Sequence, residues 1–134
     1  MYIFDRNDKC IFYREWERSK SRPDNVKEEE QLMVGLLKAL KSFVSKTTPT
    51  ESAVFDNYAT STYKLHYFES GTGIKFVLIS DPKTASLGQE LREIYRDYYV
   101  EYISKNPLYK LGSPINCASF TVAIDKFIKG LTSF

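Results

Sequence analysis

The sequence predicts a domain of mixed α+β class, with its elements in the order strand, strand, helix, strands, helix, helix. Two hairpin patterns of apolar and β-branched residues, near residues 2–13 and 63–79, flank one long helical repeat, and two more helical repeats follow the second hairpin. A chain of 134 residues can build one core without disulfide or metal cross-links, so a single domain over residues 1–134 is expected.

The first hairpin and the first helix come at the start of the chain. Tyr2-Ile3-Phe4 and Cys10-Ile11-Phe12-Tyr13 are strand-forming runs on either side of a polar turn. A helix is predicted from near Asn25, a good N-cap residue, to about Lys46, because Thr47-Thr48-Pro49 then ends the apolar repeat.

This first helix carries more apolar surface than one side of a small sheet usually covers. Leu36, Leu40 and Phe43 can face one neighbour, while a second apolar set lies further round the helix. The second set is Met33, Leu37 and Val44, and these three residues are the predicted partner interface.

The central strands follow the first helix. A short edge strand is predicted around Val54, Phe55 and Tyr58, and an alternating strand then starts near Tyr63. A turn at Gly71-Thr72-Gly73 leads into a nearly continuous apolar run to Ile79, as expected of a central strand.

Two helices complete the predicted fold. Ser86 and Gln89 resemble a capping box, and the helix that follows should end at Asn106-Pro107. Ser113-Pro114 resembles the start of the last helix. The apolar stripes of the helices and strands predict a core made of Leu36, Leu40, Leu65, Phe76, Leu78, Ile94, Tyr98, Phe120 and Phe127.

Composition and charge disfavour several classes of function. A net charge of +2 gives little attraction for nucleic acid or an anionic membrane surface, so no nucleic-acid partner and only indirect membrane contact are expected. Cys10 and Cys117 lie in apolar runs that predict buried, reduced thiols. With no long apolar segment at its start, the chain is expected to be cytoplasmic.

The candidate catalytic groups are few. His66 is the only histidine, and no close-spaced set of metal ligands accompanies it, so we expect no metal site and no cofactor. Gly71-Thr72-Gly73 joins two strands and lacks the Lys-Ser/Thr and helix of a phosphate-binding loop. A Cys-His nucleophilic pair stays open at this point, although two core thiols and a strand histidine explain the same residues better.

The predicted helix that follows residue 86 is rich in tyrosine. Tyrosine combines a large apolar area with a polar tip, which suits it to protein interfaces as well as to a half-buried core. Both roles are therefore open for its tyrosines, which include Tyr95, Tyr98, Tyr99 and Tyr102.

Short strings along the chain are more specific than the order of its elements. They are Tyr2-Ile3-Phe4-Asp5-Arg6, Cys10-Ile11-Phe12-Tyr13-Arg14-Glu15-Trp16, Lys27-Glu28-Glu29-Glu30, Ser42-Phe43-Val44-Ser45-Lys46, Tyr63-Lys64-Leu65-His66-Tyr67-Phe68-Glu69 and Thr72-Gly73-Ile74-Lys75. From Tyr2 to about Leu111 the chain resembles the small longin-type subunits of the TRAPP tethering and exchange complex, and among them the subunit 1 family.

The resemblance implies a longin fold of order ββαβββαα. In that fold a five-stranded antiparallel sheet carries the first helix on one face and the two later helices on the other. The resemblance also implies a core subunit that pairs with a second longin-type subunit, abuts Bet-type subunits, and contacts a Rab GTPase through the assembled complex.

The assembly so implied is a tethering and guanine nucleotide exchange complex in endoplasmic reticulum to Golgi vesicle transport. The chain would be a non-catalytic subunit, cytoplasmic and peripherally associated with Golgi and endoplasmic reticulum membranes through the complex. A longin-type adaptor or coat subunit that binds cargo or coat partners is the alternative. A small hydrolase is a distant third, because the histidine and carboxylate geometry for it is missing.

Overall fold

The computed structural model describes residues 1–14, 16, 26–47, 57–61, 63–110 and 112–130, except for the side chains at positions 26, 27, 44, 45 and 47. The chain divides into two compact units. The first unit comprises Met1–Trp16 and Asp56–Phe134, and the second comprises Glu17–Phe55. The expectation of a single domain over the whole chain stays a prediction.

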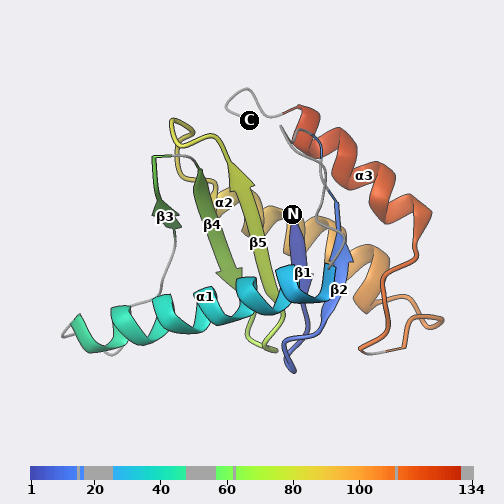
Figure 1. The fold of residues 1–134 in the computed structure, drawn as a ribbon. Helices are drawn as coiled ribbons and strands as arrows, with labels where there is room; N and C mark the ends of the chain where they lie inside the picture. The colour runs from blue at the N-terminus through green and yellow to red at the C-terminus, as the bar shows by residue number, and fades with distance from the viewer. Residues whose placement is uncertain (15, 17–25, 48–56, 62, 111, 131–134) are drawn as a thin grey trace. The chain divides into compact units, whose positions relative to one another are not determined.

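The first unit is built on a five-stranded antiparallel sheet with the strand order β2-β1-β5-β4-β3 (Figure 1). The strands are β1 (Tyr2–Phe4), β2 (Cys10–Tyr13), β3 (Asn57–Ala59), β4 (Lys64–Glu69) and β5 (Lys75–Ser80). Both predicted hairpins are present, and β1 pairs with β5 so that they form one sheet. The predicted α+β class and element order are therefore confirmed, while Val54 and Phe55 of the expected edge strand lie outside the described residues.

Two turns fix the register of the hairpins. In the first hairpin, Asp5 Oδ1 accepts hydrogen bonds from the backbone N–H groups of Asn7 and Lys9, both at 2.9 Å. In the second, Gly73 has a φ of 89°, and a Cβ atom there would lie 3.0 Å from the Cβ atom of Arg6. Glycine is thus required at position 73 by both its conformation and the neighbouring chain.

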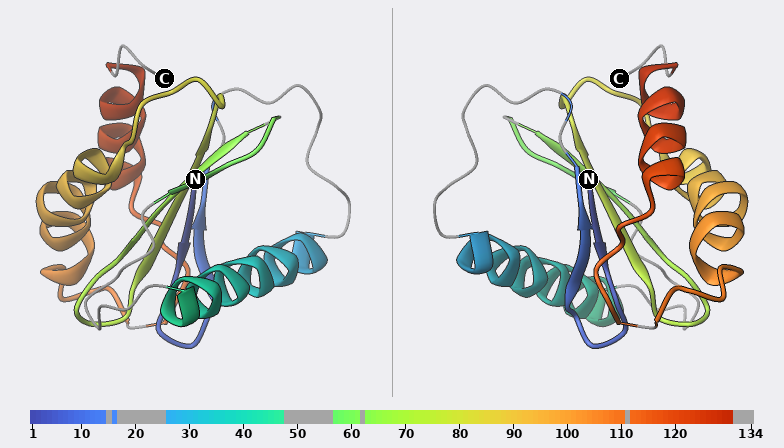
Figure 2. Two further views of the ribbon diagram at one scale, coloured as in Figure 1. Left: turned by 90° about the vertical axis from the view of Figure 1, so that its left-hand side faces the viewer. Right: turned by 90° about the vertical axis from the view of Figure 1, so that its right-hand side faces the viewer.

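Three helical segments cover one face of this sheet (Figure 2). They are α2 (Gly88–Glu93), the π-helix η1 (Ile94–Ser104), which continues α2, and α3 (Ala118–Lys129). Strand residues such as Ile3, Phe76 and Leu78 join the apolar faces of these helices in one buried cluster. The burial of this cluster is the main stabilising term of the first unit.

The last two helices depart from the prediction in two places. The expected α-helix after residue 86 becomes π-helical at Ile94, although its end before Asn106 is confirmed. The last helix begins at Ala118, four residues later than the Ser113-Pro114 signal indicated. Ser113 lies in a turn instead, in which its N–H donates to the Lys110 carbonyl oxygen at 3.0 Å. Ile115 N–H then donates to the Ile11 carbonyl oxygen at 2.7 Å, so the chain runs beside β2 before the helix starts.

Most of the predicted core is confirmed within the first unit. The buried members are Leu65, Phe76, Leu78, Ile94 and Phe120, and the partly buried ones are Tyr98 and Phe127. The expected burial of the thiols is only partly correct. Cys10 and Cys117 are not joined in a disulfide and are half-buried, since Cys10 begins the edge strand β2 and Cys117 is the N-cap residue of α3.

The second unit contains α1 (Val26–Thr47), which confirms the predicted first helix. Glu28 and Glu29 lie in its first turn and Lys46 in its last turn, where each charge complements the helix dipole. The expected packing of Leu36 and Leu40 against the sheet, and of the helix on the opposite face from α2 and α3, stays a prediction.

Candidate protein interface

The tyrosines of η1 form two sets with different surroundings. Tyr99 is 6% exposed, and its ring stacks on Tyr95 at 5.8 Å and meets Phe76 edge-on at 5.6 Å. Burial, with smaller effects of Tyr109, Tyr95 and Asp5, raises the pKa of Tyr99 to about 12. Tyr95 and Tyr99 therefore belong to the core and are not interface residues.

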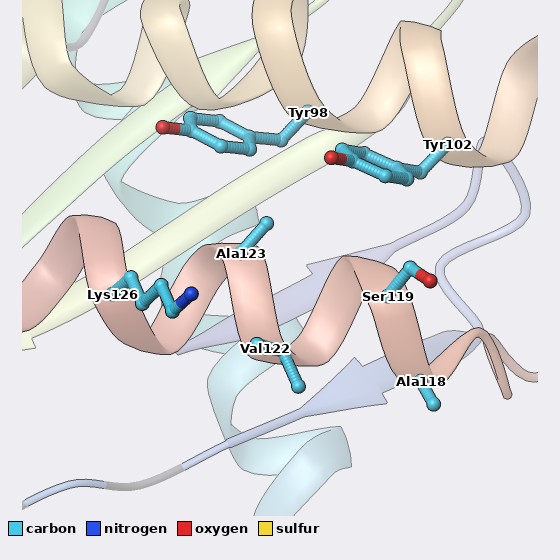
Figure 3. Close-up of a pocket in the computed structure, with 7 residues that line it drawn as sticks. All are labelled: Tyr98, Tyr102, Ala118, Ser119, Val122, Ala123 and Lys126. Carbon is cyan, nitrogen blue, oxygen red and sulfur yellow. The ribbon is translucent and has the colours of Figure 1, made fainter.

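The other two tyrosines face α3. The Tyr98 ring lies 5.3 Å from that of Phe127, and Tyr102 is 37% exposed. Both line a groove of about 510 Å³ between η1 and α3 (Figure 3). The α3 wall of this η1–α3 groove consists of Ala118, Ser119, Val122, Ala123 and Lys126.

The polar side chains that line the groove can all donate hydrogen bonds. Burial and the nearby Glu93 carboxylate raise the pKa of Tyr98, so its hydroxyl stays protonated at neutral pH. Tyr102, Ser119 and Lys126 add two hydroxyls and an ammonium group. Among the described residues that line the groove none carries a carboxylate, and Lys126 contributes a positive charge, while the Glu93 and Asp97 carboxylates act on Tyr98 from outside this lining.

An ion pair holds α3 to the end of the first hairpin. Arg14 Nε and Nη2 donate to the two carboxylate oxygens of Asp125 at 3.0 and 2.8 Å. The indole N–H of Trp16 donates to Asp125 Oδ1 at 2.7 Å. The hydrogen bond from Arg14 is the largest influence that lowers the pKa of Asp125. This Arg14–Trp16–Asp125 cluster fixes the helix that forms one wall of the groove.

The lowered pKa of Asp125 predicts a pH-dependent contribution to stability. A carboxylate with a depressed folded-state pKa stabilises the fold above its unfolded value of 3.8, and loses this effect as pH falls through the folded-state value. We expect Asp125→Asn to lower the free energy of unfolding by about 1 to 2 kcal/mol at neutral pH, with the difference vanishing in acid. Urea denaturation at several pH values measures this.

Asp97 offers a matched control for that experiment. It also pairs with an arginine, Arg96, at 3.0 Å, but both side chains are largely exposed. Asp97→Asn should therefore change stability less than Asp125→Asn at neutral pH. Equal effects of the two substitutions would contradict a structural role for the Asp125 cluster.

His66 has a structural role in the described contacts. Its Nε2 lies 2.8 Å from Ser80 Oγ, and its Nδ1 accepts a hydrogen bond from Leu87 N–H at 3.2 Å. Both ring nitrogens thus hold the loop that leads into α2. Strands β1 and β5 lie between Cys10 on β2 and His66 on β4, a separation of about 14 Å at the usual strand spacing. Cys10 and His66 therefore do not form a nucleophilic pair.

Two further kinds of feature are absent from the described part of the chain. It contains no group of three or more His, Cys, Asp or Glu side chains that could hold a metal ion. It also contains no helix with the length and apolar character needed to cross a membrane.

The predicted interface residues all lie on α1. Met33, Leu37 and Val44 fall within about 40° of one another around the helix axis, so they share one side of it. Their role as an interface stays a prediction. Two other apolar residues, Leu32 and Phe43, are 68% and 64% exposed, which periodicity alone did not indicate. They lie eleven residues, about three turns, apart and therefore share another side of α1.

The spacing of Leu32 and Phe43 was visible in the sequence. Periodicity groups them with Leu36, but it cannot show which part of a wide apolar arc stays exposed. The groove between η1 and α3 had a weaker signal. The tyrosines pointed to an interface, whereas the small residues of α3 carried no such indication.

Comparison with known proteins places the chain in a family. The model of the Sybindin-like family matches residues 1–131. Over 137 residues the chain is 38% identical to trafficking protein particle complex subunit 1 of Dictyostelium discoideum, covering 100% of this chain and 96% of that protein. It is 40% identical over 135 residues to the Homo sapiens protein of the same name, covering 100% and 93%. It is 32% identical over 150 residues to transport protein particle subunit bet5 of Schizosaccharomyces pombe, covering 99% and 96%. The chain therefore belongs to the Sybindin-like family.

Proposed function

We propose that this chain is a core subunit of a TRAPP-type tethering complex that exchanges guanine nucleotide on a Rab GTPase in endoplasmic reticulum to Golgi transport. The observation that carries the proposal is similarity over the full chain to relatives named as subunit 1 of the trafficking protein particle complex. The chain would act as a non-catalytic subunit in the cytoplasm, peripherally associated with Golgi and endoplasmic reticulum membranes through its partners.

The physics of nucleotide exchange supports a subunit that works through contact surfaces. An exchange factor accelerates release by binding the nucleotide-free GTPase more tightly than the loaded one. Such binding requires complementary surfaces and no acid, base or nucleophile. In this chain, exposed Leu32 and Phe43 on α1 and the tyrosines of the η1–α3 groove offer surfaces of the required kind.

The size of one such domain argues that exchange needs the whole assembly. Stable protein interfaces bury about 1,200 to 2,000 Å² in total, and a GTPase held without nucleotide needs contacts around its switch regions. A sheet of five short strands with its helices offers little area for that task once it also binds other subunits. We therefore assign exchange to a composite surface.

Release of a fluorescent GDP analogue from an early secretory Rab tests the proposal. The chain alone should neither accelerate release nor hydrolyse GTP, whereas the reconstituted complex should accelerate release and lose most of that activity when this subunit is omitted. Full exchange activity in a complex that lacks this chain would show that it is dispensable for exchange. Failure to co-purify with any TRAPP subunit would contradict the proposal as a whole.

A further inference from the structure

The η1–α3 groove presents several side chains that the core does not bury. Its wall residues Val122 and Tyr102 are 52% and 37% exposed, while the buried stripe of α3, Phe120, Ile124 and Ile128, faces the core. A groove of about 510 Å³ lined by exposed apolar and aromatic side chains is a typical site for a partner. The chemistry of its lining restricts what that partner can be.

The polar lining selects an anionic group. The hydroxyls of Tyr98, Tyr102 and Ser119 can donate hydrogen bonds, and Lys126 adds three donors and a positive charge. Within the described residues, Lys126 takes part in none of the ion pairs that the structure shows. A carboxylate can satisfy these donors and this charge together, and it is the common anionic side chain of proteins.

The walls of the groove favour a helix as the occupant. Both walls are helices whose backbone groups bond internally beyond the first turn of α3, so they offer few free backbone partners to an extended peptide. A helix satisfies its own backbone hydrogen bonds before it docks. The side chains of Ala118, Ser119 and Ala123 are small, so another backbone can approach α3 closely.

We infer that the η1–α3 groove binds an amphipathic helix of a neighbouring subunit, whose carboxylate pairs with Lys126 while its apolar side chains pack on Tyr98, Tyr102 and Val122. This inference rests on the proposed function, because it takes the neighbour to be a subunit of the same complex. It adds a second contact surface, separate from the predicted one on α1.

Charge reversal in the co-expressed complex tests the inference. Lys126→Glu should weaken retention of one neighbouring subunit at least tenfold, because it opposes the partner carboxylate. Lys126→Arg keeps the charge and should retain that subunit. Lys110→Glu is the matched control, since it makes the same charge change at an exposed position outside the groove and should have no effect.

A zero-length carbodiimide cross-link identifies the occupant. In the intact complex Lys126 should join to an Asp or Glu on a helix of the neighbouring subunit, and the Lys126→Arg complex should lack that product. Retention of every subunit by Lys126→Glu, or a cross-link to a segment that is not helical, would overturn the inference.

Two other outcomes separate this inference from alternative explanations. If the chain binds vesicles of phosphatidylcholine and phosphatidylserine through Lys126 while subunit retention is unchanged, the groove binds anionic lipid and the inference is wrong. If the complex assembles and the groove variants have no effect, the inference fails while the proposed function stands. If the wild-type chain joins no TRAPP subunit, the proposed function itself fails.

Discussion

Leu78→Ala should lower the free energy of unfolding by about 2 to 5 kcal/mol, which is the usual cost of truncating a buried leucine. Leu78 lies on β5, between β1 and β4, and is fully buried in the cluster shared by the sheet and its three helical segments. The substitution removes apolar contacts and leaves a cavity that neighbouring strands cannot easily close. A loss of this size is a large part of the total stability of a small domain.

Leu108→Ala provides the control for this experiment. It is the same substitution at a residue that is 91% exposed, so it should change stability by less than about 0.5 kcal/mol. Urea denaturation followed by far-ultraviolet circular dichroism measures both variants. Equal midpoints for Leu78→Ala and the wild type would contradict the assignment of β5 as the central strand of the core.

The sheet could be predicted well from sequence because its signals are local. Alternating or continuous apolar residues define β4 and β5. The turn between these strands contains Gly73, whose positive φ only glycine adopts easily. The first hairpin was predictable for the same reason, since Asp5 closes a short polar turn through its own side chain. In these elements local propensity and tertiary structure agree.

One of the two errors in the helices has a tertiary cause. Ser113-Pro114 has the composition of a helix start, but the hydrogen bond from Ile115 to Ile11 keeps the chain extended beside β2. The π-helical turns of η1 were not predictable, because apolar spacing of three and four residues describes an α-helix equally well. Local sequence signals cannot decide between such alternatives when a distant strand contributes the bond.

The candidate interfaces were less predictable than the fold. Periodicity identified the wide apolar arc of α1 but not the exposure of Leu32 and Phe43 within it. The η1–α3 groove depends on how two helices pack, and residues such as Ala123 and Lys126 acquire a role only through that packing. An interface depends on which side chains meet at the folded surface. A sequence pattern can therefore identify the helices that carry an interface, but not the residues that form it.

The predicted interface on α1 can be tested against the exposed pair on the same helix. Met33→Asp with Leu37→Asp changes the predicted side, and Leu32→Asp with Phe43→Asp changes the other. If the predicted side is the interface, Met33→Asp, at a half-buried position, should lose co-purification with a second longin-type subunit and keep its circular dichroism spectrum. Leu37 is 3% exposed, so Leu37→Asp buries a charge and should also lower the stability of the chain. Normal co-purification with an intact spectrum would remove Met33 and Leu37 from consideration.

Leu32→Asp with Phe43→Asp should weaken assembly by about a hundredfold or more, because two unpaired carboxylates buried in an interface cost several kcal/mol. Their exposures of 68% and 64% mean that the substitutions cost the folded chain little. Gln31→Asp with Ser42→Asp is the matched control, since it adds the same charge at exposed polar positions on a different side of α1. Co-purification and analytical ultracentrifugation of each variant with the partner subunit measure the effect. If the Leu32 and Phe43 variant assembled as well as the control, the exposed apolar side of α1 would not be an interface.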